Sequence, residues 1–139
     1  MRCRVLSVGL LLPAWLAAAP ALAGVEVRAC RQDDGAARKI VGELSCGSAV
    51  DCPIGPDGLS LRAADGAGEW PVSDPVFVDE TGRPLDEPPM RGTIRALWRA
   101  SLPAADAPDR LQLYFEGRPV GAPFVPGEDC SALPRPRGG

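Results

Sequence analysis

The residues best suited to chemistry are the cysteines of the stretch SCGSAVDC, Ser45 to Cys52, where two thiols stand six positions apart. Such a pair is compatible with half of a metal site, a redox centre or a structural disulfide. Two further cysteines, Cys30 and Cys130, lie on either side of the stretch, and the fifth, Cys3, belongs to the N-terminal segment that we expect to be cleaved off. The residue types around these four cysteines distinguish the three chemistries.

Metal and redox chemistry are both disfavoured. The chain contains no histidine, which excludes imidazole ligation of zinc or copper and any Ser-His-Asp or Cys-His catalytic arrangement within it. A four-cysteine zinc site usually contains two close pairs, whereas the spacings here are 16, 6 and 78. A redox pair favours Cys-x-x-Cys at the start of a helix, but Pro53 and Gly55 follow Cys52. We therefore predict no metal, no cofactor and no catalytic residue.

Two structural disulfides are the remaining interpretation, and an even number of cysteines in a small exported domain favours them. Four cysteines allow three connectivities, and the sequence does not decide among them. We favour Cys46–Cys52, which closes a local loop, together with Cys30–Cys130, which ties the first strand to the C-terminal region. Each disulfide is expected to stabilise the fold by about 2–4 kcal/mol.

The first 23 residues have the three-part pattern of a secretory signal peptide. Arg2 and Arg4 supply a positive start, an apolar stretch covers 5–18, and Ala21 and Ala23 supply the small residues that precede cleavage. A membrane anchor is the alternative, but the apolar stretch is short for a span and prolines interrupt it. We expect cleavage after Ala23, no membrane anchor in the mature chain, and a periplasmic or secreted protein.

The charge of the mature chain disfavours nucleic acid as a partner. Without Arg2 and Arg4 the chain has 13 basic residues against 18 acidic ones, and it contains no basic run. Lys39 is the single lysine, and we expect it at the surface beside a turn.

Alternation of apolar and polar residues predicts strands rather than helices. In residues 92–102, Ile94, Ala96 and Trp98 fall on one face, and a helix is the competing interpretation until Pro103 ends the segment. The predicted strands are 25–29, 38–44, 59–63, 76–78, 92–102, 111–116 and 120–125. Glycine, proline and aspartate separate them, which is typical of a small antiparallel β-sandwich, immunoglobulin-like, or a partly open barrel. We assign 24–130 to a single domain of this kind and 131–139 to a flexible tail.

Two short segments carry a family resemblance. VFVDETGRPL, from Val76, resembles the strand–turn–strand of bacterial immunoglobulin-like and carboxypeptidase-regulatory-like domains. LQLYFEGRPVG, from Leu111, resembles the hairpin of many immunoglobulin-like and lectin-like sandwiches. Each resemblance covers about ten residues and implies a sandwich fold without indicating a ligand.

Four residues are candidates for partner binding. Trp70 lies between prolines in an expected loop, where its ring either contacts a partner or folds back over the core. Arg95 and Arg99 lie on the polar face of one strand, and Tyr114, with Gln112, on the polar face of another. If these strands are neighbours, the side chains form a patch for an acidic partner. A plain solvated sheet face is the alternative.

Acidic pairs recur at Asp33-Asp34, Asp79-Glu80, Asp86-Glu87 and Glu128-Asp129, and solvated turns or Ca²⁺ ligands are both compatible with them.

We predict an exported, non-enzymatic binding or accessory protein of the bacterial cell envelope with a protein partner. One alternative is a small secreted inhibitor of a hydrolase such as lysozyme or a protease, using the loop DEPPM or the Cys46–Cys52 loop. Another is a hydrolase that uses carboxylates alone or with Ca²⁺.

Overall fold

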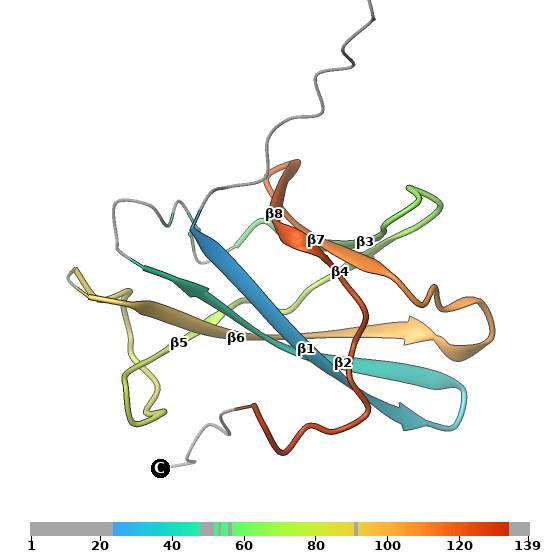
Figure 1. The fold of residues 1–139 in the computed structure, drawn as a ribbon, viewed down its shortest axis with the longest axis horizontal. Coiled ribbons are helices and arrows are strands. Elements are labelled where there is room, and N and C mark those ends of the chain that lie inside the picture. Colours follow the sequence, from blue (N-terminus) through green and yellow to red (C-terminus); the bar gives the residue numbers. More distant parts are fainter. Residues whose placement is uncertain (1–23, 48–51, 53, 56, 91, 134–139) are drawn as a thin grey trace, which may run out of the picture.

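The chain folds into two antiparallel four-stranded sheets packed face to face (Figure 1). The computed structural model describes residues 24–47, 52, 54–55, 57–90 and 92–133. One sheet has the strand order β1-β2-β6-β5 and the other the order β4-β3-β7-β8. The strands are β1 (Val25–Asp34), β2 (Ala37–Cys46), β3 (Leu59–Ala63), β4 (Glu69–Pro71), β5 (Val76–Val78), β6 (Ile94–Pro103), β7 (Leu111–Phe115) and β8 (Arg118–Phe124). The predicted β-sandwich is confirmed. The predicted signal peptide, 1–23, lies outside the described residues.

The seven predicted strands are all present, and the structure adds an eighth. Strand β4 occupies the segment around Trp70 that we expected to be a loop, and it pairs with β3. Pro71 lies at its end, where a missing N–H costs no ladder hydrogen bond. The sequence EWP is too short to show the alternation that predicts a strand. Pairing with β3 therefore determines the extended conformation of β4.

The core lies between the sheets and follows the predicted alternation. The inward face of β6 carries Ile94, Ala96, Trp98, Ala100 and Leu102, all of them buried. Trp98 lies over Gly42 of β2, where a Cβ atom would come 2.0 Å from Trp98 Cζ2. Glycine at position 42 is therefore the residue that lets this indole enter the core.

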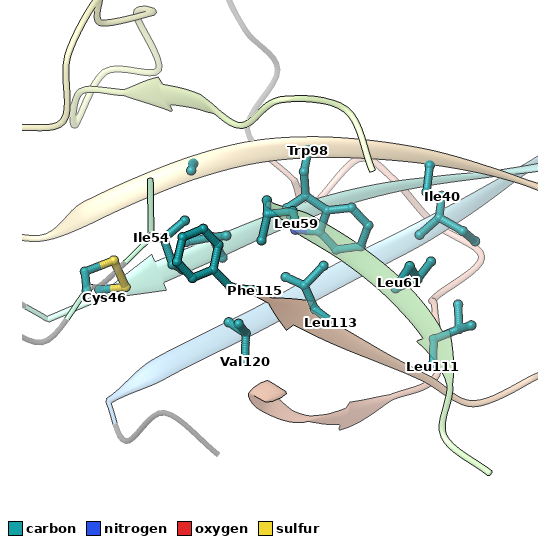
Figure 2. Close-up of a cluster of buried hydrophobic side chains, with 14 of the residues drawn as sticks. Ile40, Cys46, Ile54, Leu59, Leu61, Trp98, Leu111, Leu113, Phe115 and Val120 are labelled. Atoms are coloured by element: carbon teal, nitrogen blue, oxygen red, sulfur yellow. A yellow bond between two sulfur atoms is a disulfide. The ribbon is translucent and has the colours of Figure 1, made fainter. Parts of the chain in front are cut away.

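The disulfide Cys46–Cys52 lies at one end of this core, beside Ile54 and Phe115 (Figure 2). Leu111 marks the opposite end of the cluster in the same view. Both cysteines of this bridge are buried, so the bond also contributes apolar surface to the core. The predicted Cys46–Cys52 connection is confirmed.

The β7–β8 hairpin closes with the two residues Glu116 and Gly117, which both have positive φ, 48° and 78°. Two central residues with positive φ are the geometry of the tight hairpin turn whose twist matches the strands it joins. The predicted turn at Gly117 is confirmed.

The second disulfide, Cys30–Cys130, fastens the C-terminal segment onto β1. Gly127 pairs with the edge of β1: the Arg31 N–H donates to Gly127 O at 2.8 Å, and the Gly127 N–H donates to Ala29 O at 3.0 Å. Figure 1 shows this segment, in red, leaving β8 and passing alongside β1. The predicted Cys30–Cys130 connection is confirmed. Leu133 is buried, so the packed chain extends beyond the predicted boundary at 130, and residues 134–139 lie outside the described part.

Candidate binding groove

The outer face of the β1-β2-β6-β5 sheet holds a hollow lined by residues of β1, β2 and β6. Strand register places its side chains in rows across the sheet. One row runs Cys30, Val41, Arg99, and the next runs Gln32, Lys39, Ser101. Val41 is half-buried and apolar, and it lies between Cys30 and Arg99 in the first row. This arrangement produces an apolar floor with charged residues beside it.

Two chain segments border this floor. Pro71, Val72 and Ser73 lie along β6 on one side, and Cys130 and Leu133 lie over β1 on the other. The volume of this open hollow is about 920 Å³. This is within the usual range of ligand sites, roughly 300–1,000 Å³. We call this hollow, together with its extension described next, the outer groove.

A smaller hollow of about 280 Å³ continues the groove along β6. It shares Val41, Ser73 and Arg99 with the larger one and adds Asp74, Val76, Leu97 and Trp98. From Ser101 to Leu97 the groove follows four residues of extended chain, about 13 Å at the rise of a β-strand. The two hollows thus form one elongated site rather than two separate pockets.

Both sides of the groove are fixed to the sheet. The Ser73 N–H donates to Arg99 O at 2.8 Å, and the Arg99 N–H donates to Ser73 Oγ at 2.9 Å. On the other side, the Cys30–Cys130 disulfide is reinforced by an ion pair of 2.7 Å between Arg31 and Glu128. A site whose walls are already ordered loses little conformational entropy when a ligand binds.

Arg99 is the electrostatic feature of the groove. The β1-β2-β6-β5 sheet carries six basic side chains, and within the described residues five of them have a carboxylate oxygen within 4.0 Å: Arg28, Arg31, Arg38, Lys39 and Arg95. Arg99 is exposed and has no such partner among the described residues. Its guanidinium is therefore available to an anion from outside.

Arg95, by contrast, is committed to an internal ion pair. Its Nε donates to Glu43 Oε1 at 2.9 Å, and this hydrogen bond raises the pKa of Arg95 above its ordinary value. Glu43 is only 5% exposed although it faces outward from β2. Its second oxygen, Oε2, accepts no hydrogen bond from a described residue. Removing Arg95 would leave a buried carboxylate unpaired, so its role is structural in this geometry.

The structure separates the residues that we expected to form one arginine–tyrosine patch. Arg95 and Arg99 lie on β6, whereas Gln112 and Tyr114 lie on β7 of the other sheet. These strands are not neighbours, and the two pairs point outward from opposite sides of the sandwich. The single patch is therefore not formed, because alternation within a strand does not reveal which strands pair.

Tyr114 and Gln112 are both engaged locally. The Arg62 guanidinium lies 4.1 Å from the centre of the Tyr114 ring, and Arg62 Nε is 3.6 Å from Glu69. Gln112 Nε2 donates to the carbonyls of Leu113, Val120 and Gly121, at the bulge where the β7–β8 register shifts. Tyr114 and Gln112 therefore both have partners on their own sheet, although the buried Arg62 Nε donates no hydrogen bond to a described residue.

Trp70 is half-buried and packs against the core from β4, where it pairs with Leu61 of β3. A Cβ atom at Gly68 would come 2.8 Å from Trp70 Cη2, so the glycine leaves room for the ring. Partner binding by Trp70 stays a prediction.

The acidic pairs lie apart from one another. Asp79 is half-buried in its turn, and the other seven carboxylates of the four pairs are exposed. No group of three or more Cys, Asp or Glu residues suited to a metal ion occurs within the described chain. A hydrolase that uses carboxylates stays a prediction, since a catalytic pair needs only two carboxyl groups.

Val41, Ser73 and Leu133 are among the groove residues that were not singled out in the sequence. Val41 had a detectable signal, because strand parity places it outward between Lys39 and Glu43. Ser73 and Leu133 had none, since only the tertiary fold brings a loop and the C-terminal segment to the same sheet face.

Comparison with known proteins does not assign a family: no family model, no curated protein and no solved structure matches this chain. Within the described residues, no helix is long and apolar enough to cross a membrane. The two disulfides are typical of an oxidising extracellular or periplasmic environment.

Proposed function

We propose that this protein is an exported, non-enzymatic binding protein of the bacterial cell envelope, periplasmic or secreted, that holds another macromolecule in the outer groove. The groove itself carries the proposal. It is elongated, its floor is apolar, and hydrogen bonds and a disulfide hold its two sides. The missing histidines and the scattered carboxylates fit a binding role better than a catalytic one.

The location in the envelope rests on the sequence of the first 23 residues and on the disulfides. Protein export followed by proteolytic mapping of the mature N-terminus tests it. Cleavage after Ala23 and recovery from the periplasmic fraction or the medium are expected. Recovery of the uncleaved chain from the cytoplasm would refute an envelope role.

The binding role is tested by blocking the groove with a bulky side chain. Ser101 is exposed within the groove, and Ser101→Trp fills it without disturbing the core. Ser60 faces outward from β3 of the other sheet, so Ser60→Trp is the matched control. Thermal unfolding should first show that both variants fold like the wild type.

Affinity capture from envelope extract is then compared among the three proteins. We expect wild type and Ser60→Trp to retain the same partner, and Ser101→Trp to lose it. If Ser101→Trp captures the same proteins as the wild type, the outer groove is not the interface.

A second candidate, a hydrolase inhibitor, is favoured by Met90. This side chain is 91% exposed and follows Pro88 and Pro89, which stiffen the chain before it. Inhibitors commonly present such a rigid protruding residue to an enzyme cleft. Assays with lysozyme and with periplasmic proteases should show inhibition by the wild type and its loss in Met90→Ser. Absence of inhibition at micromolar concentration would eliminate this candidate.

A further inference from the structure

The outer groove combines one available cation with apolar neighbours, and this combination restricts what can occupy it. We infer that the occupant is an extended acidic segment of a partner protein, with an Asp or Glu carboxylate on Arg99 and apolar side chains on either side. The inference rests on the proposed binding function. It adds the chemistry of the partner.

The charge of the groove favours an acidic occupant. Arg99 is exposed at the middle of the groove, and it is the basic residue of its sheet that lacks a carboxylate neighbour among the described residues. Lys39 lines one end of the groove, but its ammonium lies 3.1 Å from Asp34 and is therefore already paired. Asp74 lines the extension of the groove but forms no ion pair within 4.0 Å among the described residues, so Arg99 remains the available cation of the groove although the chain as a whole is acidic.

The apolar lining of the groove favours a ligand with apolar groups beside its carboxylate. Val41 lies directly opposite Arg99, and Leu97 and Val76 pair with each other one row along β6. Val76 is 42% exposed, which leaves apolar surface available beside the cation. A free inorganic anion would leave this surface uncovered. A ligand with apolar groups beside its carboxylate would bury it.

The shape of the groove favours an extended peptide. The groove follows β6 for about 13 Å, the length of roughly four extended residues. Along this line Leu97, Arg99 and Ser101 alternate with inward residues, so outward contacts occur at every second position. An extended peptide presents its own side chains toward the sheet with the same period.

Strand addition to the sheet is a different mode of recognition, and the edges disfavour it. Strand β5 and residues Val72 and Ser73 cover the outer edge of β6, and Gly127 pairs with β1 at Ala29 and Arg31. Recognition therefore depends on side chains in the groove rather than on backbone pairing.

The test selects ligands without assuming their identity. Phage-displayed random dodecapeptides are panned on the intact, disulfide-bonded protein. We expect the enriched peptides to share an Asp or Glu flanked by apolar residues. One enriched peptide, fluorescently labelled, is then titrated against the wild type, Arg99→Gln and Arg118→Gln. Arg118 is an exposed arginine on β8 of the other sheet and is the matched control.

Binding should weaken about tenfold or more in Arg99→Gln, the usual effect of losing a charge-assisted hydrogen bond, and remain unchanged in Arg118→Gln. Enrichment without acidic residues, or equal affinity in Arg99→Gln, overturns the acidic occupant. In that case loss of binding in Ser101→Trp would still support the groove as an interface. Binding that survives Ser101→Trp refutes the groove as well.

Absence of any enriched peptide also overturns the inference. If the protein then self-associates in sedimentation experiments, and Ser101→Trp abolishes the association, the occupant is a second copy of this chain instead.

Discussion

The outer face of the β1-β2-β6-β5 sheet and the outer face of the β4-β3-β7-β8 sheet carry similar residue types in different circumstances. On the second face, Arg62 stacks on Tyr114 and lies near Glu69, and Gln112 donates to three carbonyls. On the first face, Arg99 stands in a groove without a carboxylate partner among the described residues. Tyr114 and Gln112 on one face are engaged in contacts within the fold, whereas Arg99 on the other face remains available for a ligand.

The two disulfides differ in a related way. Cys46–Cys52 spans six residues and is buried at the end of the core, whereas Cys30–Cys130 spans 100 residues and holds one side of the groove. The local bridge supports the core alone. The long bridge supports both the fold and the site.

Removing the two disulfides should have unequal consequences. Replacing Cys30 and Cys130 by alanine should cost about 5 kcal/mol, and replacing Cys46 and Cys52 about 2 kcal/mol, because the longer loop gains more chain entropy on unfolding. Denaturant unfolding under non-reducing conditions measures both. Only the first double variant should lose binding of a groove ligand. Retention of that binding would show that the C-terminal segment is not part of the site.

Gln112 and Arg99 should differ in their effect on stability. Gln112→Ala leaves buried carbonyls without their donor and should cost about 1–3 kcal/mol. Arg99→Ala removes no ion pair to a described residue and should change stability by less than about 0.5 kcal/mol. Chemical denaturation of both variants checks this. Gln112→Glu, which keeps the side-chain size but removes the donor, should cost at least as much as Gln112→Ala. An equal loss for Arg99→Ala would contradict the contrast between the faces.

Tyr114 should contribute modestly to stability and nothing to the groove. Tyr114→Leu loses the stacking with Arg62, which is worth about 0.5–1 kcal/mol at an exposed site. Tyr114→Phe keeps the ring and should behave like the wild type. Thermal unfolding together with ligand titration measures both quantities. Reduced ligand binding in Tyr114→Leu would place part of the interface on the opposite face.

The smallest effect concerns acid stability at the turn after β5. The Arg83 N–H and the Thr81 hydroxyl donate to Asp79 and hold the pKa of its carboxyl below the ordinary 3.8. Its contribution to stability is therefore present above pH 3.8 and is lost as the pH falls from there through the lowered pKa. Asp79→Asn should remove this part of the acid dependence, and Thr81→Val should reduce it. Unfolding free energies between pH 2 and 5 measure it, and an unchanged slope in Asp79→Asn would be contrary to expectation.

The features that the sequence predicted correctly are those set by residues close together along the chain. Alternation identified the inward face of β6 and the hairpin at Gly117, because burial of one sheet face imposes a period of two. It missed β4, where three residues are too few to show a period. It also joined Arg99 and Tyr114 into one patch, since alternation shows which residues share a face but not which strands lie side by side.

The stretch from Ser45 to Cys52 illustrates the same division. Residue types alone, above all the missing histidines and the prolines that follow, were sufficient to favour a disulfide over metal or redox chemistry. The pairing of all four cysteines required the fold, because Cys30 and Cys130 come together only across 100 residues.

Composition, alternation and turn residues therefore determined the fold class, most strands and the kind of cysteine chemistry, since each follows from interactions between residues near in sequence. The tertiary structure alone decided the outer groove. Its floor comes from β2 and β6, and its sides come from the segment after β4 and from the C-terminal segment. Sites of this kind arise from long-range pairing and covalent closure, which leave no periodic pattern in the sequence.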